Sequence, residues 1–236
     1  MISIIITARE EPKATYECIK RFLEQDFPEK YEIWVTCPDE STKKVVMNQK
    51  KIYPKIINFL QQPLNKGKNS MLNILFKKVK GGVIIMTDGD VFVEKNCVNE
   101  IYQFFKDPKV GAVCGRPMSL NPRNNMLGYW SYLLNYGAHK IRKKLFMQGK
   151  FLECSGYLWA IRKGLIDKIP LDVAEDSITP YLIWDRDYKI AYAEKAIAYT
   201  KFPTNIKDWI NQKVRTTKAH EKLIYYMKGN KKVRVK

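Results

Sequence analysis

The sequence lacks closely spaced cysteines, a basic leader and any long apolar run. Its cysteines are Cys18, Cys37, Cys97, Cys114 and Cys154. They are too scattered for zinc sites or redox motifs, so we expect reduced, mostly structural thiols. The start, MISIIITARE, has no basic segment before its short apolar run, and no stretch approaches about eighteen uninterrupted apolar residues. These absences predict a cytosolic protein without a signal peptide or membrane span.

Acidic residues are missing from one long segment and scarce in another. Residues 108–152 hold 8 basic residues and no acidic one, and residues 201–236 hold 11 basic and 2 acidic residues. Nearly all of the formal net charge of +18 lies in these two segments. Such localised charge favours an anionic partner, such as nucleic acid, a phosphate-bearing ligand or the inner face of a membrane, with solubility alone as the alternative.

One segment combines this charge with apolar residues. Asn124–Met147 begins aromatic and aliphatic and ends in a cluster of basic residues: Lys140, Arg142, Lys143 and Lys144. The pattern is typical of a helix lying on a membrane surface, and equally of a covering helix with a solvated basic end.

The first half alternates strand-like and helical runs. Strands are expected at Ile2–Thr7, Glu32–Thr36, Lys55–Leu60 and Val83–Thr87, and helices at Lys13–Gln25, Ser41–Lys51 and Asn69–Lys78. This alternation predicts an α/β domain with a mixed, mostly parallel central sheet and helices on both faces. The second half is less regular, with strands expected at Glu153–Arg162 and Ile190–Thr200, and a final helix at Asn205–Met227. We expect one domain over residues 1–228 and a basic tail at 229–236.

The stretch GGVIIMTDGDVFVEKN places Asp88 and Asp90 directly behind a continuous apolar run. Asp-Gly between apolar runs can mark a tight hairpin turn. A hairpin with one face in water would show alternation, whereas Val83–Met86 is uninterrupted and suits a buried parallel strand. Helical spacing follows Val93, so no clear return strand is expected. The pattern therefore predicts a strand, an acidic loop and a helix.

Three polar clusters follow predicted strands. They are Thr7-Ala8-Arg9-Glu10, Cys37-Pro38-Asp39 and Asp88-Gly89-Asp90. Right-handed crossovers gather the carboxyl ends of such strands along one edge, where open α/β sheets bind ligands. Two carboxylates on such a loop can hold Mn²⁺ or Mg²⁺, because these cations prefer oxygen ligands and bridge phosphate oxygens.

The TDGD segment resembles the Asp-x-Asp motif of family-2 glycosyltransferases, and other segments match in the family's order. SIIITAREE is similar to the family's opening strand and nucleotide-contacting loop, CPDEST to its second, acidic strand end, and NKGKNSMLN to its Gly-Lys segment. SGYLWAIRK is similar to the acceptor-side Ser-Gly loop, AEDSI to the Glu-Asp catalytic motif, and NQKVR in part to the Gln-x-x-Arg-Trp segment. The resemblance implies a single GT-A domain, with a nucleotide-sugar half at about 1–115 and an acceptor half at about 116–228.

Carried over by position, the resemblance implies a donor site. The residues implied to contact the nucleotide are Thr7, Ala8, Arg9, Glu10 and Asp39. Lys68 would also approach it, Asp88 would bind ribose or metal, and Asp90 would ligate Mn²⁺ or Mg²⁺ between the diphosphate oxygens. His220 would complete the metal site, as a late histidine does in some GT-A enzymes. The donor is expected to be a UDP-sugar, with a GDP-sugar as the alternative.

The resemblance also implies an acceptor site. Gly156 would let the acceptor approach the donor closely, and Asp176, beside Glu175, would be the general base of an inverting reaction. Gln212 and Arg215 can share one helical face, where Arg215 would bind diphosphate. Independently of the resemblance, Arg142, Lys143, Lys144 and the C-terminal basic residues predict a cytoplasmic protein that is peripheral on the inner face of the membrane. Its acceptor would be a lipid-linked molecule or a glycan.

Each assignment has a plainer alternative. Glu175 and Asp176 can simply be acidic residues in the first turn of a helix, where acids are favoured. Gly67 and Lys68 can form an ordinary turn. Arg215 and His220 can be exposed helical residues. The chain has Thr216 where processive synthases have Trp, which favours transfer of a single sugar over polymerisation.

Two other functions compete with glycosyl transfer. A sugar-1-phosphate nucleotidyltransferase would need a glycine-rich loop after the first strand, and residues 7–12 hold no glycine. A nucleic-acid-binding protein could use the basic segments, with Trp130, Tyr132 and Tyr136 for stacking. Because that function leaves the three aspartates at 88, 90 and 176 without a role, we expect no nucleic-acid partner.

Overall fold

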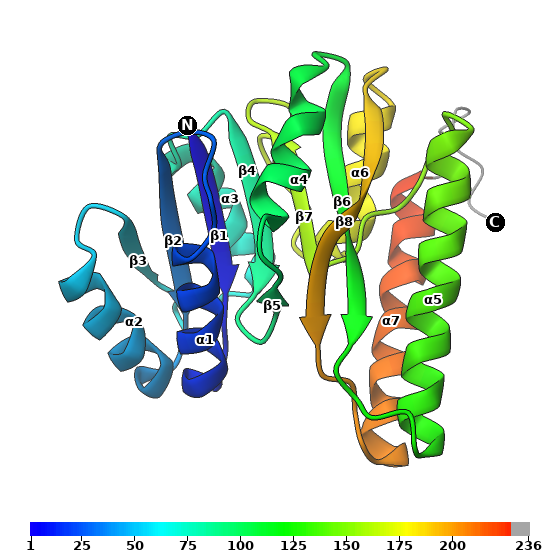
Figure 1. Ribbon diagram of the computed structural model, residues 1–236, viewed down its shortest axis with the longest axis horizontal. Helices are drawn as coiled ribbons and strands as arrows, with labels where there is room; N and C mark the ends of the chain where they lie inside the picture. Colours follow the sequence, from blue (N-terminus) through cyan, green and yellow to red (C-terminus); the bar gives the residue numbers. More distant parts are fainter. Residues whose placement is uncertain (228–236) are drawn as a thin grey trace.

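The computed structural model describes residues 1–227, apart from the side chains of residues 219 and 220. Its eight strands form one sheet in the order β3-β2-β1-β4-β7-β6-β8-β5 (Figure 1). The strands are β1 (Ile2–Thr7), β2 (Tyr31–Cys37), β3 (Ile57–Gln61), β4 (Val83–Asp88), β5 (Phe92–Val93), β6 (Val110–Ser119), β7 (Leu158–Arg162) and β8 (Lys189–Thr200). The tail predicted at residues 229–236 lies outside the described residues.

Helices cover both faces of the sheet (Figure 1). They are α1 (Pro12–Leu23), α2 (Glu40–Ile52), α3 (Lys68–Lys78), α4 (Cys97–Tyr102) with a following 3-10 turn (Gln103–Lys106), α5 (Met126–Met147), α6 (Glu175–Trp184) and α7 (Ile206–Met227). Helices α1, α2 and α4 pack into one apolar core, and α3, α6 and the end of α7 pack into the other. The predicted α/β class, with a mixed, mostly parallel sheet between two helical layers, is confirmed.

The N-terminal half is the regular part of the sheet. Strand β1 pairs in parallel with β2 and β4, and β2 pairs in parallel with β3. All six residues of β1 are buried; Ile4 and Ile6 point into one core and Ile5 into the other. A continuous apolar run is therefore what this strand requires, because it has no face in water. The parallel pairing brings the ends of β1, β2 and β4 to one edge.

The C-terminal half differs from the sequence-based expectation in two places. Strand β6 was not predicted, because Gly111, Gly115 and Pro117 lower its strand propensity. A Cβ at Gly111 would lie 2.6 Å from Ile183 Cγ2, so close helix packing explains that glycine. The strand predicted at 153–162 begins only at Leu158, since the five preceding residues form a loop.

The acidic loop does not form a hairpin. Strand β4 pairs with β1 and β7, while the two-residue strand β5 pairs antiparallel with β8 through Phe92–Tyr199 and Val93–Ala198. The expectation that no return strand pairs with β4 after the loop is therefore confirmed, although the sequence did not reveal the short strand β5, which pairs with β8 instead. Its partner lies about a hundred residues further along the chain, so the loop is anchored between the two halves of the sheet.

Helix α5 packs on β6 and β8 through small and polar residues. The hydroxyls of Ser131 and Ser119 are hydrogen-bonded at 2.7 Å, and Nδ1 of His139 is hydrogen-bonded to the hydroxyl of Tyr192 at 2.9 Å. Within residues 1–227, no helix is both long and apolar enough to cross a membrane.

Candidate active site

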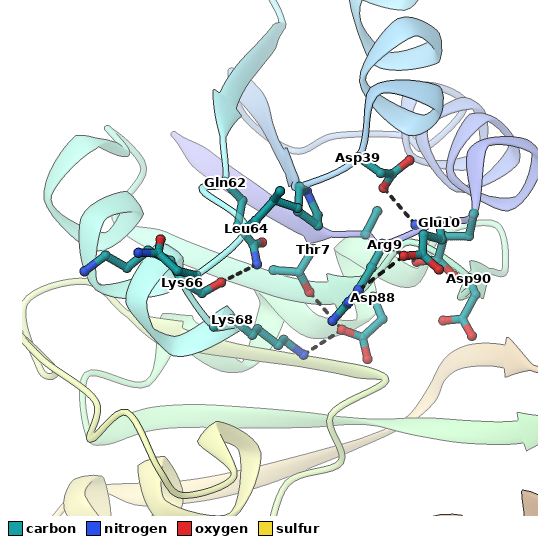
Figure 2. A pocket seen from close by; sticks show the side chains of 15 residues that line it. Thr7, Arg9, Glu10, Asp39, Gln62, Leu64, Lys66, Lys68, Asp88 and Asp90 are labelled. Carbon is teal, nitrogen blue, oxygen red and sulfur yellow. Dashed lines mark hydrogen bonds and ion pairs between the residues drawn. The ribbon is translucent and has the colours of Figure 1, made fainter.

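A cleft of about 520 Å³ opens at the edge where β1, β2 and β4 end (Figure 2). The predicted donor-side residues that line it are Thr7, Ala8, Arg9, Glu10, Asp39, Lys68, Asp88 and Asp90. The loop between β3 and α3 closes one side of the cleft with Gln62 and Leu64, which the sequence reading did not single out. Leu64 is 88% exposed, so its side chain offers an apolar surface to a ligand bound in the cleft.

The second strand end supports the first through Asp39. This carboxylate accepts the backbone N–H of Glu10 at 2.8 Å and that of Thr42 at 2.8 Å, where it caps α2. Burial acts to raise the pKa of Asp39, but these hydrogen bonds hold that pKa well below its ordinary value. Glu10 has a φ of 56°, in the left-handed region that few non-glycine residues adopt. The Asp39 bond therefore holds the cleft-forming turn in a strained conformation.

Lys68 joins the two predicted carboxylate sites. Its ammonium lies 2.6 Å from Asp88 Oδ1 and 2.5 Å from Glu175 Oε1. Burial opposes the charge of Lys68, but the two carboxylates raise its pKa well above the ordinary value. Thr7 also donates its hydroxyl to Asp88 Oδ1 at 2.9 Å. Lys68 is the first residue of α3, after Gly67, so both its charge and the helix N-terminus favour an anion in the cleft.

A third carboxylate, which the sequence reading missed, lies beside the acidic loop. Burial and the charge of Asp90 raise the pKa of Glu11 to about 7. Burial and the charge of Asp88 likewise raise the pKa of Asp90. Gly89 makes this crowding feasible, because a Cβ there would lie 2.8 Å from Glu11 Oε1. The double acid in TAREE was the available signal for Glu11.

Asp176 lies on α6 against the loop that contains Gly156. A Cβ at Gly156 would lie 3.0 Å from Asp176 Oδ2, and the backbone of Gly156 is hydrogen-bonded to this carboxylate. Burial and the charge of Glu175 raise the pKa of Asp176 to about 6. A carboxylate with such a pKa is ionised near neutral pH and is basic enough to accept a proton. Both acids also lie in the first turn of α6, as the plainer alternative expects, and Glu175 forms the ion pair with Lys68 as well.

Two of the predicted site residues on the final helix do not line the cleft. Gln212 is half-buried and Arg215 is exposed, and neither lines the cleft. Arg215 acts electrostatically on Tyr157, whose pKa is raised to about 12 by burial and by Asp90 and Asp88. The side chain of His220 lies outside the described residues.

The residues present fit a divalent cation with oxygen ligands. Within the described residues, no group of three or more His, Cys, Asp and Glu side chains gathers in metal-binding geometry. Asp88 and Asp90 nonetheless offer two carboxylates on one loop, and no described basic side chain forms an ion pair with Asp90. Burial, and after it the neighbouring carboxylates, raise the pKa values of Glu11 and Asp90, and a bound cation would offset both effects.

The cleft therefore combines an anion-attracting side with a cation-attracting side. Lys68 and the N-terminus of α3 can attract phosphate-like groups, while Asp88 and Asp90 favour a divalent cation. Asp176 lies beyond them as a carboxylate that can accept a proton. Such an arrangement can bind a nucleoside diphosphate through a metal and deprotonate a hydroxyl nearby.

Residues 1–219 match the sequence profile of the family described as glycosyltransferase like family 2. An N-acetylglucosaminyltransferase of Rhizobium meliloti (strain 1021) is 21% identical over 92% of this chain and 54% of that relative. A probable glycosyltransferase of Bacillus subtilis (strain 168), YdaM, is 26% identical over 94% of this chain and 56% of that relative. The chain thus spans about half the length of these curated relatives.

Solved structures share the fold. The mannosyltransferase PcManGT from Pyrobaculum calidifontis, in complex with GDP-Man and Mn²⁺, superposes with a TM-score of 0.79 at 18% identity, covering 98% of this chain and 65% of that one. S. aureus TarS 1–349, in complex with UDP-GlcNAc, gives a TM-score of 0.62 at 19% identity, covering 86% of this chain and 59% of that one.

Proposed function

The chain belongs to glycosyltransferase-like family 2, and on that premise we propose that it moves one sugar from a nucleoside-diphosphate sugar to an acceptor hydroxyl, with inversion at the anomeric carbon. The observation that carries the proposal is the Lys68 bridge from Asp88 to Glu175, beside Asp176. This bridge supports the proposal, because it joins Asp88, the proposed donor-side carboxylate, to the residue next to Asp176, the proposed base. Transfer of a single sugar is favoured by Thr216, which stands where processive synthases have Trp.

The donor would lie in the cleft between the ends of β1 and β2 and the N-terminus of α3. Thr7, Ala8, Arg9, Glu10 and Asp39 would surround the base and ribose. Lys68 would turn its ammonium toward the diphosphate, which brings more negative charge than either carboxylate partner. We favour a UDP-sugar, and the GDP-Man and UDP-GlcNAc complexes of the similar structures support testing both bases.

Asp88 and Asp90 would hold Mn²⁺ or Mg²⁺, which when bound neutralises charge on the departing diphosphate. Asp176 would take the proton of the acceptor hydroxyl as that oxygen attacks the anomeric carbon. Gly156, without a side chain, would leave room for the acceptor against Asp176. Glu175 would position Lys68 through their ion pair and would not touch the acceptor.

The acceptor side carries the basic residues. We propose a lipid-linked or other anionic acceptor, because α5, which lies in the acid-free segment 108–152, and α7 both follow strands that end near the cleft. The protein would then act at the inner face of a membrane, to which it binds peripherally.

Calorimetric titration with UDP and GDP, with and without Mn²⁺, tests the proposal directly. We expect Mn²⁺-dependent binding of one nucleotide, and at least about tenfold weaker binding by Asp90→Asn, since the variant loses a charged oxygen ligand. Asp208→Asn, an exposed aspartate on α7, is the matched control and should bind normally. Absence of binding of either nucleotide by the folded wild type would refute the proposal.

Gly156→Ala tests the acceptor side. Its Cβ would lie 3.0 Å from Asp176 Oδ2, so the carboxylate must shift by a few tenths of an ångström. We expect kcat to fall about tenfold to a hundredfold, with the nucleotide affinity and Tm nearly unchanged. Gly82→Ala is the control, because a Cβ there meets no atom within 4 Å. Equal kcat in wild type and Gly156→Ala would remove this glycine from the acceptor site.

A further inference from the structure

The first turns of helix α5 turn more large apolar side chains outward than inward. The buried residues of the helix are Leu127, Gly128, Ser131 and His139, of which only Leu127 has a large apolar side chain. The outward residues of its first three turns are apolar and exposed by 40 to 51% of their surface: Met126, Tyr129, Trp130, Leu133 and Leu134. A surface helix normally turns its apolar stripe inward, so this outward stripe requires a different explanation.

The start of α7 extends the same surface. Ile206, Ile210 and Val214 recur at every fourth position and are 56, 51 and 47% exposed. The rings of Trp130 and Trp209 contact each other with centroids 5.4 Å apart, so the first turns of the two helices adjoin (Figure 1). We call these outward apolar residues of α5 and α7 the outer apolar patch.

Basic residues surround the outer apolar patch. Lys140 and Lys144 continue the outward stripe of α5, and Lys207 is exposed on the first turn of α7. Arg123 stacks over the ring of Tyr132 at 3.6 Å. Asp208 is the single acidic residue in the first three turns of the two helices. Exposed aliphatic and aromatic side chains with a basic border match an anionic lipid surface, where Trp and Tyr favour the interface and Lys and Arg attract the headgroups.

The outer apolar patch lies at the catalytic edge. Strands β4 and β6 run in the same direction, because both are antiparallel to β7, and β8 is parallel to β6. Helix α5 follows the end of β6 and α7 follows the end of β8, so both begin at the edge that carries Asp88. The contact between Tyr157 and Phe202, at 5.8 Å between ring centroids, connects the acceptor loop to the segment before α7.

We propose that the outer apolar patch docks on an anionic lipid bilayer and turns the catalytic edge toward it. The acceptor hydroxyl would then come from an amphiphile embedded in that bilayer. This acceptor class rests on the glycosyltransferase function proposed above, whereas docking itself does not. Contact with a second copy is disfavoured, because a two-fold interface sets the same surface against itself and would oppose the basic borders.

Co-sedimentation of the full chain with vesicles tests the docking. Vesicles of phosphatidylcholine are compared with vesicles that also contain phosphatidylglycerol. We expect binding to the anionic vesicles, weakened at least about tenfold by Ile210→Glu and by Leu133→Glu, because each places a charge where an apolar side chain would enter the interface. Ile52→Glu is the matched control, since Ile52 is 67% exposed at the end of α2, and it should sediment like the wild type.

Several outcomes would overturn the proposal. They are no sedimentation with anionic vesicles, equal sedimentation of Ile210→Glu and Ile52→Glu, a wild-type dimer that Ile210→Glu dissociates in sedimentation velocity, and tighter binding to duplex oligonucleotide than to vesicles. Mn²⁺-dependent nucleotide binding is measured on the same samples. Its retention by Ile210→Glu shows a folded variant, and its absence from the wild type contradicts the proposed transferase without affecting the vesicle result.

Discussion

Asp176→Asn is expected to lower kcat by about 10²-fold to 10⁴-fold while leaving nucleotide binding intact. The variant keeps the shape and the hydrogen-bonding position beside Gly156 but cannot accept a proton, and a general base contributes on this scale. Transfer is measured with the donor and acceptor found by screening, and binding by titration. A variant with more than a tenth of the wild-type kcat would remove Asp176 from the role of base.

The pH dependence of the wild type checks the same residue. The pKa of Asp176 is raised from 3.8 to about 6, so the carboxylate form that can act as a base is lost below pH 6. We expect kcat/KM to fall about tenfold per pH unit there. The folded state also holds this proton more tightly than the unfolded chain, so the stability from the protonated form is lost as pH rises through about 6. Asp176→Asn should therefore have the higher Tm at pH 8.

Lys68→Met is expected to damage both stability and donor binding. Removal of the ammonium leaves Asp88 and Glu175 facing each other without a cation, and Glu175 is nearly buried, at 11% side-chain exposure. Because Lys68 and Asp88 are themselves partly exposed, we expect a loss of about 2 kcal/mol of unfolding free energy, between the values for surface and buried pairs. Loss of the charge facing the diphosphate should weaken donor binding about a hundredfold.

The position of Lys68 gives this variant a second signature. Its charge lowers the pKa of Asp176, so Lys68→Met should move the acidic limb of the kcat/KM profile to higher pH. Lys66→Met is the matched control, because Lys66 lines the same cleft but is exposed. If the acidic limb of the kcat/KM profile does not shift and the donor binds normally, the ion pairs of Lys68 with Asp88 and Glu175 have only a structural role.

The meeting of the proposed donor-side residues in one cleft could be predicted from sequence, because most of them directly follow regular strands. Continuous apolar runs marked β1 and β4, and the polar residues directly after them had to meet at one edge of a parallel sheet. Spacing could not show that Lys68 reaches both Asp88 and Glu175, because the latter lies more than a hundred residues later. Glu11 was missed because its burial beside Asp90 is set by tertiary packing.

The acceptor side was harder to predict for a physical reason. Strand β6 contains Gly111, Gly115 and Pro117, which all lower the local strand propensity. Close packing explains the two glycines, because a Cβ at either would lie within 3 Å of a neighbouring side-chain atom. The five residues before β7 include the buried residues Cys154 and Ser155, yet they form a loop in which Gly156 lies against Asp176 of α6. The outward apolar stripe of α5 left two interpretations open, since the pattern alone does not say which side faces the sheet.

The pairing of β5 with β8 has a consequence for the protein during its synthesis. Phe92 and Val93 bond to Tyr199 and Ala198, so the loop with Asp90 is anchored only after β8 has left the ribosome. The cleft walls from β1, β2 and α3 come from the first third of the chain and can assemble earlier. A nascent chain would thus form the nucleotide-facing walls well before it fixes the Asp90 carboxylate. In the proposed transferase, metal-dependent donor binding would therefore begin only after the proposed acceptor half has been synthesised.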